Sequence, residues 1–493
     1  MRSSSTGVPE SRSGHYRLSR RAALAAAALA AAVLTGCTAD RTPAAAPASS
    51  TPPARPPDFR PGSEGIGDPY FPTYGNGGYD VASYDLKLRY DPPTGELTGT
   101  ATIAATATQD LSRFNLDLAN LTASTVTVDG RPAHTGHTDD ELVVTPESGV
   151  VRGRPFTVVI RYGGKPQPLA NTSLGRGGWF RTKDGAFAIG EPESASTWYP
   201  VNDHPADKAT FALAMTVPNG LDVLSNGVPG PRETAKGWTT WRWSESAPMA
   251  SYLSTVVIGQ YRVRSSVHAG KPTVIAIPES LPADGPAAQS VNRTGEIADF
   301  LATQFGPYPF DAYGGIVIND DRIRYALETQ SRPVYGQAFF GAGPNPVVIA
   351  HELAHQWFGD SVALERWQDV WLNEGFATYA EWLWLEHAGT ATVAKSFDNV
   401  YATFEWPEAP GNPRAAHLFG PAVYQGGAMT LYALRRLIGD AAFATLLKTW
   451  PAEQRNGNGT TAEFIATAER VSGMELDRFF QTWLYGTAKP AHP

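Results

Sequence analysis

The sequence predicts a chain with two folded domains, the first rich in β-strands and the second mainly α-helical. Roughly 430 residues follow a leader and a Pro-rich stretch, too many for one hydrophobic core. Apolar and polar residues alternate with a period of two over much of 65–264. Residues 265–493 contain apolar residues at helical spacing instead, so we expect the change of fold near residue 264.

Residues 1–37 have the features of an export signal. A basic opening that includes Arg20 and Arg21 precedes an apolar run, AALAAAALAAAVLTG, which is shorter than the roughly 20 residues of a membrane span. The run ends at Cys37 in LTGC, which resembles a bacterial lipoprotein processing box. SRRAALA resembles a twin-arginine signal, and the choice between this route and the general one stays open. We therefore expect a lipoprotein anchored through Cys37 on the outer face of the bacterial cell membrane, or released to the medium.

Residues 38–64 form a predicted linker. Ala, Pro, Ser and Thr dominate this stretch, which cannot bury apolar surface and should act as an extended tether. Cys37 is the only cysteine of the chain, so disulfides and cysteine metal sites are excluded.

The first domain, 65–264, is predicted to be an antiparallel sheet. YDVASYDLKLRYDPP, PFTVVIRYGG and ATFALAMTVP alternate apolar and polar residues, and Gly, Pro, Asn and Asp turns separate such segments. The second domain, 265–493, opens with the strand TVIAIP, a helix through VNRTGEIADFLATQFG and the strand YGGIVIND, before the helices that carry the chemistry.

Two histidines on one predicted helix indicate a metal site. Asn345 and Pro346 can begin this helix and Gly359 can end it. His351 and His355 are four residues apart, so their side chains lie on one helix face and can bind the same ion.

A carboxylate should complete this site. Eighteen residues separate His355 from Glu374, which lies in a second predicted helix between Asn373 and Gly389. Two histidines and one carboxylate are a common ligand set of hydrolytic zinc, with a fourth position left for water. Glu352, beside the first histidine, is then free to act as a general base toward that water and as an acid toward the leaving amine. The pattern predicts a zinc-dependent amide hydrolase with one Zn²⁺.

HELAHQWFGD together with NEGFATYAEW resembles the aminopeptidase N-like zinc metallopeptidases, a gluzincin family that includes leukotriene A4 hydrolase. The resemblance implies a saddle-like N-terminal β-sheet domain and a thermolysin-like, mainly α catalytic domain. It also implies hydrolysis of the N-terminal residue from peptides with a free N-terminus. The chain resembles a short bacterial form that lacks the family's C-terminal helical domain, and we expect a monomer.

The resemblance implies two acids that bind the substrate's free amine. Glu191 lies in a segment, Ala188 to Phe211, that aligns with the family, although Ile189 stands where a Gln is common. Glu328 lies in ALETQ, which resembles a variant of the family's Gly-x-Met-Glu-Asn motif. Physically, a buried ammonium group must be paired, so a carboxylate beside the metal favours chains that start in the site.

The resemblance also assigns Tyr424 as a hydrogen-bond donor to the oxyanion of the tetrahedral intermediate. The family pattern is Tyr-x-Lys-Gly-Ala, and Gly426 replaces the lysine here.

Three other functions stay open. A thermolysin-like endopeptidase uses the same ligands, an epoxide hydrolase is related, and a non-catalytic peptide-binding lipoprotein is a third possibility. A net charge of −8 and a pI near 5.7 argue against nucleic-acid binding.

Overall fold

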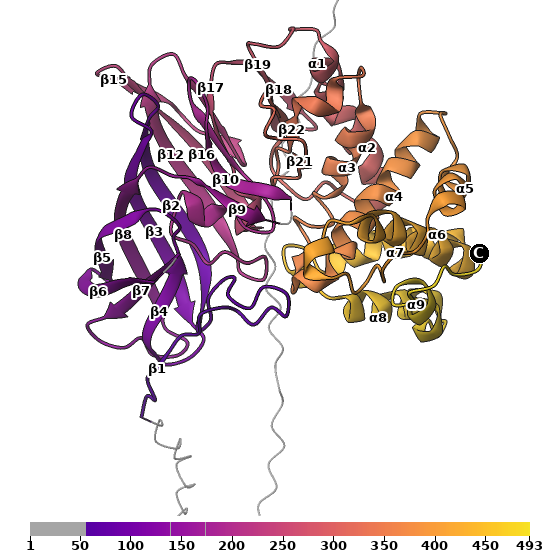
Figure 1. Ribbon diagram of the computed structural model, residues 1–493, viewed down its shortest axis with the longest axis horizontal. Coiled ribbons are helices and arrows are strands. Elements are labelled where there is room, and N and C mark those ends of the chain that lie inside the picture. The colour runs from indigo at the N-terminus through magenta and orange to yellow at the C-terminus, as the bar shows by residue number, and fades with distance from the viewer. Residues whose placement is uncertain (1–55, 139, 173) are drawn as a thin grey trace, which may run out of the picture. The chain divides into compact units, whose positions relative to one another are not determined.

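The structure is a computed structural model that describes residues 56–138, 140–172 and 174–493. The predicted signal peptide, with Arg20, Arg21 and Cys37, and most of the predicted linker lie outside these residues. The described part has the expected order, a β-rich N-terminal part followed by a mainly helical part (Figure 1).

The N-terminal part is built on a twelve-stranded sheet in the order β1-β4-β7-β6-β5-β8-β3-β2-β12-β16-β14, with β15 paired to β16. Its strands bury alternate residues, as the sequence pattern predicts. Its strands are β1 (Arg60–Pro61), β2 (Tyr79–Asp91), β3 (Glu96–Ala107), β4 (Leu111–Asp117), β5 (Thr122–Val128), β6 (Arg131–Thr138), β7 (Glu141–Pro146), β8 (Pro155–Gly164), β12 (Lys208–Pro218), β14 (Val228–Pro229), β15 (Glu233–Ala235) and β16 (Trp238–Ala250).

The sheet is mixed, whereas the sequence pattern suggested antiparallel pairing throughout. β12 runs parallel to β2, and β1 runs parallel to β4. Enough residues lie between β2 and β12 for the crossover connection that parallel pairing needs. The alternation of apolar and polar residues along each strand does not reveal such a connection. β1 also lies inside the predicted linker.

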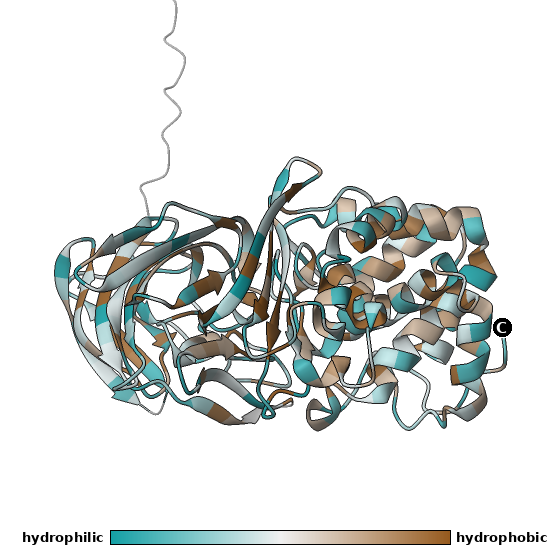
Figure 2. Ribbon diagram, turned by 90° about the horizontal axis from the view of Figure 1, so that it is seen from above, coloured by the Kyte–Doolittle hydropathy of each residue, from teal (hydrophilic) through white to brown (hydrophobic). Residues whose placement is uncertain are grey.

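A second sheet of the N-terminal part has five antiparallel strands in the order β13-β17-β11-β10-β9. Two of its inner strands, β11 and β17, are buried along their whole length. Figure 2 shows hydrophobic segments inside the molecule and hydrophilic segments on many of its outer turns. The strands are β9 (Pro168–Thr172), β10 (Gly175–Arg181), β11 (Ala186–Ile189), β13 (Asp222–Ser225) and β17 (Val256–Gly259).

The C-terminal part begins with a mixed sheet in the order β18-β19-β20-β22-β21, whose edge strand β21 borders the site described below. The predicted boundary after Arg264 falls inside β18, which pairs with β19 along its whole length. The strands of this part are β18 (Tyr261–His268), β19 (Lys271–Pro278), β20 (Tyr313–Ile318), β21 (Ala326–Leu327), β22 (Val334–Gly336), β23 (Ala363–Leu364) and β24 (Asn458–Gly459).

Helices make up the rest of the C-terminal part. Within the described residues, none is both long and apolar enough to cross a lipid bilayer. The helices are α1 (Pro286–Val291), α2 (Thr294–Phe305), α3 (Pro346–Ala354), α4 (Trp371–His387), α5 (Val393–Thr403), α6 (Gly427–Ile438), α7 (Asp440–Glu453), α8 (Thr461–Ser472) and α9 (Asp477–Trp483).

The helix that carries the histidines is shorter than the sequence predicts. Asn345 caps it as expected, since its side chain accepts a hydrogen bond from the Val348 N–H. It ends at Ala354 rather than near Gly359, and His355 keeps right-handed helical backbone angles as its C-cap. The chain then continues in turns, in which the Asp360 N–H donates to the His355 carbonyl. Gly359 therefore lies within these turns and does not mark the end of the helix.

Buried polar contacts join the β-rich part to the helical part around this turn. The ammonium group of Lys208, at the start of β12, donates to the carbonyls of Asp360, Ser361 and Gly457 at 2.8, 2.9 and 3.1 Å. Asp68 accepts a hydrogen bond from the Trp367 N–H at 2.8 Å. These contacts fix the β-rich scaffold against the segment that follows His355.

Two acids on adjacent strands make a pH-dependent contribution to stability. Glu141 on β7 lies directly opposite Asp117 on β4, and burial raises the pKa of Glu141 to about 7. The folded state thus binds this proton more tightly than the unfolded state, so stability falls as pH rises from about 4.5 through about 7. Glu141 is partly exposed, so solvent screening reduces the effect. We expect Glu141→Gln, which cannot ionise, to stabilise the protein by about 1–2 kcal/mol at pH 8 and by little at pH 5.

Urea unfolding at both pH values measures this effect. Glu147→Gln, an exposed acid after the same strand, is the matched control and should change little. An equal gain at pH 5 and pH 8 for Glu141→Gln would contradict the assignment.

Candidate active site

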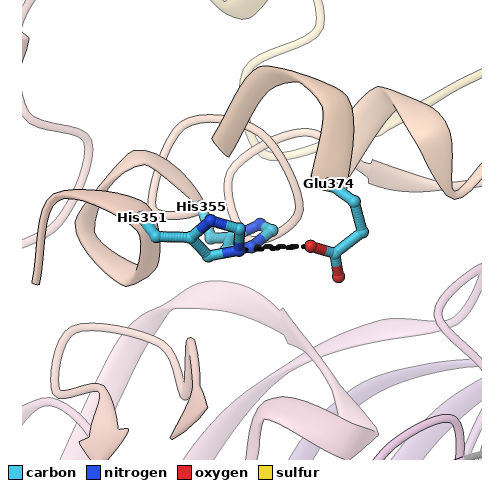
Figure 3. A group of neighbouring side chains, drawn as sticks. All are labelled: His351, His355 and Glu374. Atoms are coloured by element: carbon cyan, nitrogen blue, oxygen red, sulfur yellow. Dashed lines mark hydrogen bonds and ion pairs between the residues drawn. The ribbon is translucent and has the colours of Figure 1, made fainter. Parts of the chain in front are cut away.

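The two histidines lie together on α3. Their rings are 4.9 Å apart between centroids, and both side chains are buried (Figure 3). The four-residue spacing on a helix produces this arrangement, because such positions lie one above the other. His355 keeps its place on that face although the helix ends one residue earlier, since its backbone is still helical.

Glu374 reaches the same point from the first turn of α4, which packs against α3. Its Oε2 lies 3.2 Å from Nε2 of His351 and 3.5 Å from Nε2 of His355 (Figure 3). Although burial opposes it, the two histidines lower the pKa of Glu374 to about 2. Three potential metal ligands therefore converge on one point.

The other ring nitrogen of each histidine, Nδ1, also has a hydrogen-bonding partner. Nδ1 of His351 lies 2.7 Å from Oε1 of Glu381, and Nδ1 of His355 lies 3.0 Å from the Phe358 carbonyl. Such contacts place a proton on Nδ1 and leave Nε2 as the coordinating atom.

Glu352 faces the cavity beside the histidines but is not part of this trio. Its carboxylate, that of Glu328 and a ring nitrogen of His355 all lie within 4.8 Å of one another. Burial and the neighbouring carboxylates raise the pKa of Glu352 to about 8, against the opposing effect of the two histidines. A carboxylate with a raised pKa is suited to accept and return a proton near neutral pH.

Glu328 and Glu191 approach from two different parts of the chain. Glu328 follows β21, where the Tyr252 hydroxyl donates to its Oε1 at 3.1 Å and the Gln356 amide donates to its carbonyl at 2.8 Å. Glu191 follows β11, and its Oε1 is buried without a hydrogen-bond partner among the described residues. Burial and the negative charges of Glu328 and Glu374 raise the pKa of Glu191 well above its ordinary value. A cationic group between Glu191 and Glu328 would offset the repulsion between their carboxylates.

Tyr424 also lines this cavity. It lies in a π-helical turn, Ala422–Gly426, directly before α6, and its ring is stacked 5.9 Å from that of His351. Burial, together with the nearby acids, raises the pKa of Tyr424 well above its ordinary value, so the hydroxyl keeps its proton. π-Helical turns occur often at functional sites.

All seven predicted site residues thus line one cavity of about 400 Å³. The cavity is lined by Leu174, Glu191, Arg324, Tyr325, Ala326, Glu328, Phe339, Asn345, Val347, Val348, His351, Glu352, His355, Glu374, Glu381 and Tyr424.

Comparison with known proteins identifies the family. The Peptidase family M1 domain matches residues 291–483, and the Peptidase M1 N-terminal domain matches residues 81–253. An M1 zinc metallopeptidase of Deinococcus radiodurans, solved by crystallography, is 30% identical with a TM-score of 0.79, over 87% of this chain and 100% of that chain. This chain belongs to peptidase family M1. The predicted resemblance to aminopeptidase N-like zinc metallopeptidases is confirmed.

Further matches are a mutant of the same enzyme and longer relatives. A mutant of the Deinococcus enzyme bound to a Tyr-Ser-Ala substrate has 29% identity and a TM-score of 0.79, over 87% of this chain and 99% of that one. Aminopeptidase N of Lactobacillus delbrueckii subsp. lactis is 26% identical over 83% of this chain and 51% of its own length. The chain spans about half the length of the curated M1 relatives that it matches.

The donor set of this M1 protein fits zinc. Ligand atoms around one tetrahedral zinc, at bonds of about 2.0–2.1 Å, lie about 3.3 Å from one another. The two distances from Glu374 Oε2 to the imidazole nitrogens, 3.2 and 3.5 Å, agree with that spacing. His351, His355 and Glu374 are therefore the residues that would hold the ion.

Two contributors to this M1 site were not predicted from the sequence. Glu381 lies seven residues after Glu374 on α4, which places both on one face after two helical turns, and this spacing was a usable signal. Tyr252, in a short 3₁₀ turn of the β-rich part, gives no such signal because it reaches Glu328 only through the tertiary fold.

The role of Tyr424 stays a prediction with a direct test. Tyr424→Phe removes one hydroxyl from the cavity wall and should lower kcat about 10²-fold or more, because a preorganised donor to an oxyanion is lost. KM and zinc content should change little. Steady-state kinetics on an aminoacyl substrate, with metal analysis of the same samples, measures the effect. Unchanged turnover would refute the role of this hydroxyl.

Proposed function

We propose that this M1 family member is a zinc-dependent aminopeptidase that removes the N-terminal residue from peptides. The observation that supports this most is the position of two buried acids, Glu191 and Glu328, in the cavity that contains the candidate zinc ligands. A peptide ammonium group placed between them would offset their mutual repulsion, whereas a blocked N-terminus would leave them unpaired. The cavity therefore favours a free amino end.

The placement of the residues supports the following roles in the proposed reaction. Bound zinc supplies Lewis-acid polarisation of the scissile carbonyl and lowers the pKa of water. Glu352 accepts a proton from the attacking water and returns it to the leaving amine. Tyr424 donates a hydrogen bond to the oxygen that becomes negatively charged, and Glu328 with Glu191 holds the amine. Tyr252 fixes the Glu328 carboxylate in place.

A matched pair of substrates tests the proposal. Zinc-loaded protein should hydrolyse an alanyl peptide at least about 10²-fold faster than the same peptide with an acetylated N-terminus, because acetylation removes the charge that the acids bind. A chelator should abolish hydrolysis, and added zinc should restore it. Equal rates on both peptides would point to a thermolysin-like endopeptidase. No hydrolysis of either would favour a peptide-binding protein.

We further propose that the mature protein is a monomeric lipoprotein anchored through Cys37 on the outer face of the cell membrane. LTGC after an apolar run supports the anchor. Cells supplied with labelled palmitate should label the wild-type protein but not Cys37→Ala, and retained label in the variant would refute the anchor. Light scattering of the released soluble part tests the monomer, and a dimer mass would refute it.

A further inference from the structure

The charges that line the active-site cavity are unevenly distributed. Five glutamates border it, at 191, 328, 352, 374 and 381. Among the described residues that line it, Arg324 is the only lysine or arginine. Apart from the proposed zinc ion and its histidine ligands, Arg324 is therefore the cationic group of this lining that can pair with a substrate carboxylate.

Arg324 is available for such a pairing. Its side chain is exposed and has no hydrogen bond or ion pair with any described residue. Arg322, two residues earlier, is instead engaged, because it donates to Asp320 at 2.6 and 2.8 Å and to the Arg181 carbonyl at 2.9 Å. The neighbouring arginine thus supports the fold, while Arg324 is left facing the cavity.

The position of Arg324 relative to Glu328 sets which substrate groups it can reach. The two residues are four positions apart, with Tyr325 in a bend and β21 between them, so their Cα atoms are at most roughly 14 Å apart. If Glu328 holds the substrate amine, a dipeptide of roughly 7 Å spans about half of this separation. The flexible arginine side chain covers the remainder.

We propose that Arg324 binds a substrate carboxylate and makes the enzyme favour peptides that carry one at or next to the residue removed; this rests on the aminopeptidase function proposed above. The planar guanidinium group binds carboxylates through two parallel hydrogen bonds, which gives both affinity and geometry. The carboxylate has three possible sources: an acidic first side chain, an acidic second side chain, or the C-terminus of a dipeptide.

Three substrate pairs separate these sources. They are Glu against Gln as the first residue of an aminoacyl-coumarin, Ala-Glu-amide against Ala-Gln-amide, and Ala-Ala against Ala-Ala-amide. The quantity measured is the ratio of kcat/KM within each pair. At least one ratio should favour the carboxylate in the wild type, and Arg324→Gln should reduce that ratio about tenfold. Arg324→Glu should invert it in favour of the neutral partner.

Arg366→Gln is the matched control, because Arg366 is also exposed and does not line the cavity. It should leave all three ratios as in the wild type. The inference is overturned if Arg324→Gln and Arg324→Glu leave every ratio within about twofold of the wild type.

The same proteins distinguish a failure of this inference from a failure of the proposed function. Absence of hydrolysis of every free-amine substrate by zinc-loaded wild type would refute the aminopeptidase. Calorimetric titration of the same three substrate pairs into the zinc-loaded wild type and Arg324→Gln then tests the role of Arg324. Tighter binding of the carboxylate-bearing member of a pair, lost in the variant, supports the inference, and equal binding within every pair in both proteins overturns it.

Discussion

Replacing Glu352 with glutamine is expected to lower kcat about 10³-fold or more while the protein keeps its zinc. Glutamine has nearly the same shape as glutamate but cannot accept and return a proton, so the loss reports general acid–base catalysis, which contributes roughly 10²–10⁴-fold. Glu352 is not one of the three ligands that converge on a point, so zinc binding should persist.

The measurement combines kcat on an aminoacyl chromogenic substrate with elemental analysis of the same protein. Glu365→Gln, an exposed acid beyond the active-site helix, serves as the control and should retain wild-type turnover. If Glu352→Gln kept more than about a tenth of the wild-type kcat, another group would have to move the proton. If it lost zinc, Glu352 would have to be regarded as a ligand.

Replacement of Glu374 should have the second large effect, which is a loss of bound zinc. Glu374→Ala leaves two imidazoles where three donors converge, so we expect zinc to fall from one per chain to near zero after dialysis, together with activity. Glu381→Ala is expected to have a graded effect, about 10–100-fold weaker zinc binding, because it removes only the hydrogen-bond partner of His351 Nδ1.

Competition with a chromogenic chelator measures both affinities. The expected order is wild type tightest, Glu381→Ala intermediate and Glu374→Ala weakest. A Glu374→Ala protein that retained one tightly bound zinc would show that the carboxylate is not a ligand.

The parts of the site that depend on local geometry were predictable from the sequence. His351, Glu352 and His355 share one helix, where the backbone geometry alone decides which side chains share a face. Glu374 required the further assumption that the second helix returns to the first, which the eighteen-residue spacing allows and the usual ligand set of hydrolytic zinc favours. The structure brings these four residues to one cavity.

Features that depend on distant contacts were not predictable. The parallel pairing of β2 with β12 and the contact of Tyr252 with Glu328 join segments far apart in the sequence. Arg324 gave no signal either, because its placement in the cavity depends on the strand β21, only two residues long. The end of α3 was misplaced since Gly359 belongs to a turn that continues beyond the helix.

The central claim is that two imidazoles and one carboxylate from a separate helix bind a single zinc ion. Diffraction data collected on both sides of the zinc absorption edge, from crystals of the zinc-loaded protein, test it most directly. We predict one strong anomalous peak per chain, at about 2.0–2.2 Å from Nε2 of His351, Nε2 of His355 and a carboxylate oxygen of Glu374. A peak elsewhere, or none at these three residues, would contradict the account.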